Sequence, residues 1–198
     1  MTRRNAKAGA VKLLADVHLP NPAQVARLYP HECSGGMRQR IVLAIALASR
    51  PSLLLADEPT TALDLGVQAR VLSLIAELHR ERRMATIVVT HDIAVAKTIA
   101  DDVAVMYAGR VVEYGALADV LGGPRHPYTR GLLAADISAT QSKRPVPIPG
   151  APPPLAGLPD VCAFALRCAR ATEACWASSP TPRQVEKSIV ACYHPLGR

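Results

Sequence analysis

The sequence predicts an α/β fold, in which a mostly parallel sheet with flanking helices is followed by a small cysteine-rich extension. Between about residues 36 and 115, short apolar runs alternate with helical patterns, an order typical of parallel sheets covered by helices. After about residue 123 proline becomes frequent, and four of the five cysteines follow. A chain of 198 residues can bury one good core and carry a small appendage.

Composition and charge argue against several classes of protein. The net charge is +7, and the basic excess lies outside residues 31–123. One Phe, one Trp and five Tyr leave little for base stacking, and no run of Lys or Arg exceeds two residues. There is no apolar run of about 18 residues, and the first residues lack the apolar segment of a secretory signal. We expect no nucleic-acid partner and a protein that stays in the cytoplasm.

The first thirty residues are expected to form a helical edge piece. Val11, Leu14 and Ala15 share one helix face, and the pattern breaks at "LPNP". A second helix is expected from Gly36 to near Pro51, with Ser34 able to cap its start. Its apolar stripe consists of Met37, Ile41, Ala44, Ile45 and Ala48.

Two apolar runs, "SLLLAD" and "ATIVVT", are typical of buried parallel strands. A helix over about Val67 to Arg83 separates them, and a further helix is expected at residues 92–100. Two more strands, "VAVMY" and "RVVEYG", are joined by "AGR". That junction predicts a hairpin turn, because Gly109 can adopt a positive φ angle.

The end of the chain has a different composition. The stretch "RPVPIPGAPPPLAGLPD" predicts a linker in polyproline-like conformation. The tail of about forty residues that follows is too small to bury much core by itself. We therefore expect one domain over residues 1–123 and an extension over residues 124–198.

The stretch "SGGMRQR" at residues 34–40 has a serine and two glycines at a helix start. Helix N-termini of this kind bind phosphate. A P-loop, however, needs a Gly-Lys pair, and this sequence contains none. Either the stretch is an ordinary loop, or it serves a nucleotide whose lysine comes from elsewhere.

Two apolar strands are predicted to end in groups suited to phosphoryl transfer. "LLLADEPTTALD" delivers Asp57 and Glu58 at a strand end, where Asp57 can hold Mg²⁺ and Glu58 can act as the base for water. "TIVVTHD" places His91 on the same rim, where its imidazole can donate to a γ-phosphate oxygen. The alternatives are an acidic pair that caps a strand and a histidine that caps a helix.

In that order and spacing, "SGGMRQRIVLAIAL", "LLLADEPTTALD" and "TIVVTHD" resemble the signature motif, the Walker B strand with its D-loop, and the switch histidine of ABC ATPases. The resemblance implies the C-terminal portion of a P-loop-type ABC nucleotide-binding domain that uses ATP and Mg²⁺. It also implies roles for individual residues. These are Ser34, Gly35 and Gly36 as the signature loop, Gln39 as its support, Asp57 at Mg²⁺, Glu58 as catalytic base, Asp64 in the D-loop and His91 at the γ-phosphate.

The stretches "VAVMYAGRVVEYG" and "RHPYTRGLLAA", the prolines and the clustered cysteines are similar to ATP-binding subunits of dipeptide and oligopeptide importers. The resemblance implies a second nucleotide-binding subunit, membrane permeases, an indirect solute-binding partner and a peripheral place on the cytoplasmic face of the membrane. The Walker A loop, the adenine-stacking aromatic and the glutamine loop of such subunits are not matched. We therefore expect a truncated form that contributes the signature half of a composite ATP site.

Four cysteines in the tail are candidates for a metal centre. Their spacing is C-x5-C-x6-C-x16-C, formed by Cys162, Cys168, Cys175 and Cys192. Four thiolates suit a Cys₄ zinc ion or a [4Fe–4S] cluster. The lack of a C-x2-C pair weakens zinc, and some members of the importer family carry the cluster. His194 is a conceivable substitute ligand, and the alternative is four passive thiols.

The sequence suggests two alternative functions. The tail could make the chain a non-catalytic regulatory module that senses metal or redox state, derived from such a subunit. An ABC ATPase acting on DNA or ribosomes is less consistent with the importer-like tail. Cys33 is expected to be a small buried apolar residue without chemistry.

Overall fold

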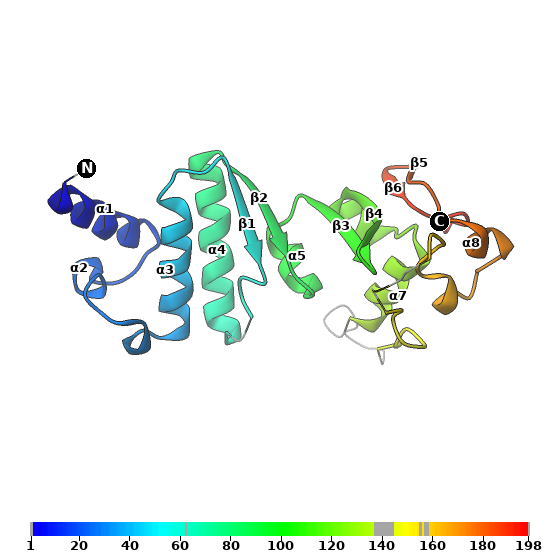
Figure 1. Cartoon of the computed structure of the whole chain (residues 1–198), viewed down its shortest axis with the longest axis horizontal. Helices are drawn as coiled ribbons and strands as arrows, with labels where there is room; N and C mark the ends of the chain where they lie inside the picture. The colour runs from blue at the N-terminus through cyan, green and yellow to red at the C-terminus, as the bar shows by residue number, and fades with distance from the viewer. Residues whose placement is uncertain (1, 62, 137–144, 155, 157–158, 198) are drawn as a thin grey trace. The chain divides into compact units, whose positions relative to one another are not determined.

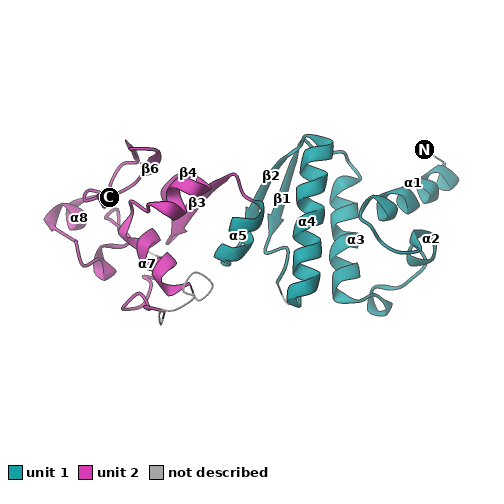
Figure 2. Ribbon diagram, turned by 180° about the vertical axis from the view of Figure 1, so that it is seen from behind, with its two compact units in different colours: residues 1–99 teal, residues 100–198 magenta. Residues whose placement is uncertain are grey.

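The computed structural model describes residues 2–61, 63–136, 145–154, 156 and 159–197. The chain divides into two compact units, residues 1–99 and residues 100–198 (Figures 1 and 2). Among the described residues, no helix combines the length and the apolar composition that a membrane span requires.

The first unit consists of five helices and two strands along its described residues. In chain order they are α1 (Arg3–Asp16), α2 (Pro22–Val25), α3 (Gly35–Leu47), β1 (Leu53–Asp57), α4 (Leu65–Arg82), β2 (Ala85–Val89) and α5 (Ile93–Ile99), with a 3₁₀ turn at Pro30–Glu32. β1 and β2 pair in parallel, from Leu53 opposite Ala85 to Asp57 opposite Val89. The predicted helices and the two predicted strands are therefore confirmed, with ends shifted by a few residues.

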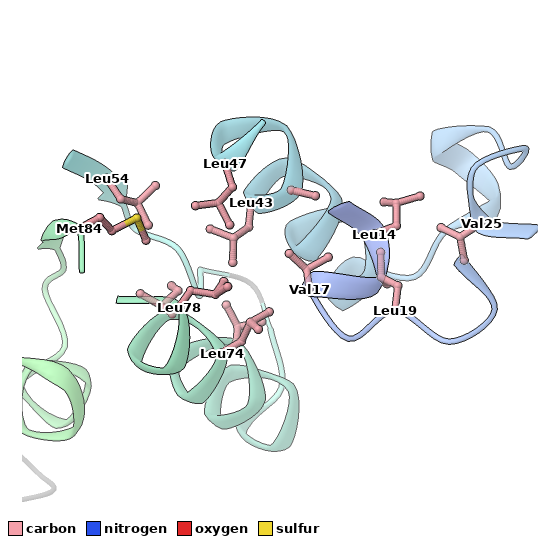
Figure 3. Close-up of a cluster of buried hydrophobic side chains, with 13 residues drawn as sticks. Leu14, Val17, Leu19, Val25, Leu43, Leu47, Leu54, Leu74, Leu78 and Met84 are labelled. Atoms are coloured by element: carbon pink, nitrogen blue, oxygen red, sulfur yellow. The ribbon is translucent and has the colours of Figure 1, made fainter. Parts of the chain in front are cut away.

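The core of the first unit lies between α1, α3, α4 and one face of the strands (Figure 3). α3 contributes Leu43 and Leu47, and α4 contributes Leu74 and Leu78, spaced so that each helix buries one face. Leu54 is the buried residue of β1, whereas Leu53 and Leu55 beside it are exposed. Burial of this many apolar side chains is what holds the short parallel pair in place.

The second unit is built on an antiparallel sheet with the order β3-β4-β6-β5. Its elements are β3 (Asp102–Tyr107), β4 (Arg110–Ala116), α6 (Leu117–Gly122), α7 (Pro127–Ala135), α8 (Glu173–Ala177), β5 (Arg183–Val185) and β6 (Ser188–Val190), with a 3₁₀ turn at Ala165–Arg167. The predicted hairpin is confirmed, since Ala108 and Gly109 form its loop with φ angles of 48° and 76°. Positive φ at both positions matches the right-handed twist of the strands.

The prediction of a mostly parallel sheet is correct only for β1 and β2. β3 and β4 form an antiparallel hairpin, and β4 pairs with β6 from the cysteine tail. The tail therefore does not need a core of its own, because it completes a sheet begun by β3 and β4. The two compact units divide between residues 99 and 100.

The second core is shared between the hairpin and the tail. Phe164 from the tail packs with Val105, Tyr107, Val112 and Val120, and its ring meets that of Tyr107 edge to face at 5.2 Å. In the described part of the proline-rich segment, which includes residues 145–154, no helix or strand is present.

A buried carboxylate anchors the start of α7. Glu113 in β4 is fully buried, and its two oxygens accept hydrogen bonds from the backbone N–H groups of Arg125 and His126 at 2.7 and 2.9 Å. The Arg125 guanidinium donates to the Leu196 carbonyl at 3.1 Å and to Glu186. These contacts tie β4, α7 and the C-terminal segment together.

Candidate functional site

The carboxyl ends of β1 and β2 place the predicted acid groups and the histidine at one edge of the sheet. The pairing continues past the last strand residues, since the backbone N–H of Glu58 donates to the Val89 carbonyl at 2.9 Å. Glu58 has a φ angle of 47°, in the left-handed region. Asp57 is exposed at the end of β1. The structure thus confirms that Glu58 and His91 lie on the same rim.

Glu58 and His91 are in direct contact. The Nδ1 atom of His91 lies 2.7 Å from Oε1 of Glu58, and the backbone N–H of His91 donates to the same oxygen at 3.2 Å. The second oxygen, Oε2, accepts a hydrogen bond from the Thr61 hydroxyl at 3.0 Å. The His91 side chain is 82% exposed, so its other nitrogen, Nε2, faces solvent and is available to a ligand.

This contact shifts the pKa values of Glu58 and His91 in opposite directions. The pKa of Glu58 is lowered, mainly by the hydrogen bond from His91 and to a smaller extent by the hydrogen bond from Thr61, while burial acts in the opposite direction and raises it. The pKa of His91 is raised, mainly by its hydrogen bond to the Glu58 carboxylate and then by the charge of that carboxylate. The pair therefore favours an ionised carboxylate beside a protonated imidazole.

The start of α3 is capped and closely packed. The Ser34 hydroxyl accepts a hydrogen bond from the Met37 N–H at 3.3 Å, while helix geometry gives the N–H groups of Gly35 and Gly36 no partner within the helix. Gly36 is required by packing, because a Cβ there would lie 2.5 Å from Cγ1 of Val67. Gln39 is half-buried one turn further along α3.

The start of α4 lies beside the start of α3. Asp64 caps α4, since its Oδ1 accepts a hydrogen bond from the Val67 N–H at 2.9 Å. A Cβ on Gly35 would be 3.5 Å from Cδ2 of Leu63. The structure therefore brings residues 34–36 together with residues 63–67, and it brings Glu58 together with His91 and Thr61.

Sequence reasoning missed Thr61. The signal available in the sequence was its position three residues after Glu58. In the structure these residues form a turn, which the backbone N–H of Thr61 closes by donating to the Glu58 carbonyl at 3.2 Å. Ser, Thr, Asn and Asp side chains in such turns commonly bond to nearby groups. The sequence alone could not show that the partner is a carboxylate oxygen.

The four tail cysteines line one pocket of the second unit, together with His126 and His194. Burial raises the pKa of Cys162, and it raises the pKa of Cys192 to about 11. His194 lies 2.8 Å from the Thr172 hydroxyl through Nε2. Across the described residues, no group of three or more His, Cys, Asp or Glu side chains has the arrangement of a metal site. The structure therefore shows that the four cysteines line one pocket, but it does not show a metal centre among the described residues. Cys33 lies buried in the first unit, as expected.

Two family models match the chain. The model described as "ABC transporter" matches residues 2–61, and the model described as "Oligopeptide/dipeptide transporter, C-terminal region" matches residues 112–175. Among solved structures, the chain is similar to a dimeric post-hydrolysis state of the ATP-binding cassette MJ0796 bound to ADP and Pi. That match has a TM-score of 0.52 and 32% identity, and it covers 59% of this chain and 49% of the other.

Curated relatives agree with these models. The chain is 45% identical over 197 residues to the oligopeptide transport ATP-binding protein OppD of Escherichia coli K12, a match that covers 99% of this chain and 58% of OppD. It is 44% identical over 172 residues to the dipeptide transport ATP-binding protein DppD of Bacillus subtilis 168, covering 85% of this chain and 50% of DppD. It thus spans little more than half the length of these relatives. The chain belongs to the ABC ATPases, in the family of oligopeptide and dipeptide transporter ATP-binding proteins, and has part of their nucleotide-binding fold.

Proposed function

We propose that the chain is an ATP-binding, energy-coupling component of an ABC importer for dipeptides or oligopeptides. The observation that carries this proposal is the contact between His91 and Glu58, at 2.7 Å, on the edge formed by two parallel strands. A carboxylate held by an imidazole at such an edge suits the attack of water on phosphorus. The sequence family of the chain supplies the substrate class.

Each group at the edge has a proposed role. Asp57, exposed at the end of β1, would hold the Mg²⁺ ion that neutralises charge on the phosphates of ATP. Glu58 takes a proton from the attacking water. His91 keeps Glu58 oriented through Nδ1 and donates from Nε2 to a γ-phosphate oxygen.

The start of α3 has a separate proposed role. Ser34, Gly35 and Gly36 present a hydroxyl, backbone N–H groups and the positive end of a helix dipole, which together suit the phosphates of ATP held by a second nucleotide-binding subunit. Gln39 supports this loop from within α3, and Asp64 belongs to the segment packed beside it. The ATP site is then composite, with contributions from two subunits.

The proposed function also implies partner proteins and a location in the cell. The pair of nucleotide-binding subunits docks on membrane permeases at the cytoplasmic face, and a solute-binding protein outside the membrane acts through the permeases. Residues 1–123 serve the nucleotide, and residues 124–198 form the importer-type extension. This functional division differs from the contact units because β3 and β4 pair with the tail.

The decisive experiment measures ATP turnover by this chain mixed with full-length OppD of Escherichia coli, with each protein alone as reference. We expect turnover above the sum of the two proteins measured alone, and a loss of that excess by a factor on the order of 10² with Ser34→Ala, which removes a donor from the loop at the start of α3. Glu81→Gln, at an exposed position of α4, is the control and should retain the excess. No excess turnover, or an excess that Ser34→Ala leaves intact, contradicts the proposal.

The cysteine pocket favours a second candidate function, a metal- or redox-sensing module. Cys162, Cys168, Cys175 and Cys192 line that pocket, and four thiolates can hold a [4Fe–4S] cluster or a zinc ion. A bound cluster would supply a one-electron redox centre. Iron, labile sulfide and visible absorbance in anaerobically purified protein, lost in Cys168→Ser and retained in Cys33→Ser, would support the cluster. A finding of zinc alone, or of no metal, would contradict the cluster.

A further inference from the structure

Two aromatic rings lie exposed just before the loop at the start of α3. The rings of Tyr29 and His31 are parallel to within 9°, with their centroids 5.7 Å apart. Tyr29 is 69% exposed, and His31 is exposed as well. Single exposed apolar side chains are ordinary on protein surfaces. Here, however, two rings are held in a stack, and the exposure of Tyr29 leaves ring area that a further flat group can cover.

The turn that carries these rings is fixed by hydrogen bonds. The backbone N–H of Tyr29 donates to a carboxylate oxygen of Glu32 at 2.7 Å, and the N–H of Glu32 donates to the Tyr29 carbonyl at 2.9 Å. Pro30 has a fixed φ angle. The next residue, Cys33, is buried, and its N–H donates to the Pro30 carbonyl at 3.3 Å. A ligand that covers a surface fixed in this way loses little affinity to ordering of the chain.

The same short segment leads directly into the proposed phosphate loop. Cys33 is followed by Ser34, which caps α3. Tyr29 comes five residues before Ser34, a span of at most about 17 Å in extended chain. The 3₁₀ turn at Pro30–Glu32 shortens this span. When the phosphates of a nucleoside triphosphate lie at Ser34, its base is therefore within reach of the rings.

We propose that Tyr29, backed by His31, is a stacking surface for the base of the nucleotide that the second subunit holds. The proposal rests on the proposed function, in which the loop at the start of α3 meets the phosphates of that nucleotide. Aromatic side chains stack on nucleobases, and every base offers a π-face. The chain then makes two contacts with one ligand, from the loop to the phosphates and from the ring to the base.

A protein partner is the competing occupant, because aromatic residues are also enriched at protein–protein interfaces. The position of the rings favours the nucleotide, since they lie on the segment that ends at the phosphate loop. The two occupants differ in one measurable respect. If the rings contact only protein, truncation of Tyr29 leaves the apparent affinity for the nucleotide unchanged.

The KM for ATP of the excess turnover, in the mixture with full-length OppD of Escherichia coli, tests the proposal. Tyr29→Ala should raise this KM on the order of tenfold, with kcat within about twofold. Tyr29→Phe keeps the ring and should leave both constants within about twofold. Tyr114→Ala, at an exposed tyrosine of the second unit, is the matched control and should change neither. An unchanged KM in Tyr29→Ala, or equal rises in Tyr29→Ala and Tyr29→Phe, overturns the proposal.

Inhibition by inorganic tripolyphosphate separates base stacking from a disturbed loop. This compound has a chain of three phosphates like that of ATP, but no base. Tyr29→Ala should therefore leave its inhibition constant within about twofold while the KM for ATP rises. Equal rises in both constants would show that the substitution disturbs the loop at Ser34, and the base-stacking role would be refuted.

A labelling measurement separates failure of this proposal from failure of the proposed function. The probe is an ATP analogue with a photoreactive azide on its adenine base, irradiated in the mixture with OppD and Mg²⁺. It should label Tyr29 or His31, within the tryptic peptide of residues 28–38. Excess turnover without label at these two residues refutes the stacking surface alone. Label at these residues without excess turnover contradicts the proposed function alone, and absence of both contradicts both.

Discussion

At the scale of single residues, Glu58 combines backbone strain with tight side-chain contacts. Its φ angle of 47° is uncommon for a residue other than glycine and costs on the order of 1 kcal/mol. Hydrogen bonds from His91 and Thr61 to its two carboxylate oxygens hold its side chain in one orientation. Strain of this kind persists where surrounding contacts fix the residue, which is common at functional sites.

The first prediction concerns the ionisation of His91. Glu58→Gln removes the carboxylate that raises the pKa of His91, so we expect that pKa to fall. An NMR titration of the histidine ring resonances measures it. Glu81→Gln is the control and should leave the His91 titration where it is. A His91 pKa that is the same in wild type and Glu58→Gln would show that the two side chains do not interact in solution.

The same pair also predicts how stability depends on pH. The raised pKa of His91 gives a contribution that is present below the ordinary histidine pKa and is lost as pH rises through the raised value. The lowered pKa of Glu58 gives a contribution that is present above the ordinary glutamate pKa and is lost as pH falls through the lowered value. The pair therefore stabilises the fold most at mildly acidic pH.

At the scale of elements, the contact between the starts of α3 and α4 controls the geometry of the candidate site. Gly36 lets the two helices approach, and Ser34 and Asp64 cap the two helices at this point. Val67, which faces Gly36, is β-branched and has one strongly preferred rotamer in a helix. It therefore cannot easily turn away from an added methyl group.

The second prediction is that Gly36→Ala destabilises the first unit by about 1–3 kcal/mol, because the new Cβ would meet Val67 at 2.5 Å. Urea unfolding measures the change in free energy. Gly35→Ala is the matched control, since its Cβ would make an ordinary 3.5 Å contact with Leu63. Adding Val67→Ala to Gly36→Ala should restore part of the loss. Equal stability of both alanine variants would count against the packing argument.

At the scale of the whole molecule, the chain forms two units whose cores are separate. The first core joins α1, α3, α4 and the parallel strands (Figure 3). The second joins the β3–β4 hairpin to the tail through Phe164 and through the pairing of β4 with β6. A tail without enough apolar residues for its own core is thereby held in place.

The third prediction tests whether the β3–β4 hairpin and the tail depend on one common core. Phe164→Ala should lower the stability of the second unit by about 3–5 kcal/mol, because a buried aromatic ring is removed from between the hairpin and the tail. Hydrogen exchange should show faster exchange of amides in β3 and β4 and unchanged exchange in α3 and α4. Leu166→Ala, at a side chain that is 73% exposed, is the control. Loss of protection in both units would show that they unfold together.

Prediction from sequence succeeded where the signal was local. The periodicity of residues 36–48 and 67–83 gave α3 and α4 nearly in full, and the apolar runs gave β1 and β2. The rim location of Glu58 and His91 followed, since parallel strands share a carboxyl edge. It failed for the pairing of β4 with β6 in the tail, because strand pairing between distant segments leaves no local pattern.

The sequence by itself determined the longer helices and the parallel strands of the first unit, the β3–β4 hairpin and the chemical groups at the strand ends, because periodicity and turn chemistry act over a few neighbouring residues. It also determined the family, through ordered motifs that need no coordinates. Only the tertiary structure decided that the tail joins the β3–β4 hairpin and that Thr61 bonds to Glu58. Both depend on the direction of side chains and backbone in space, which packing of the complete chain sets.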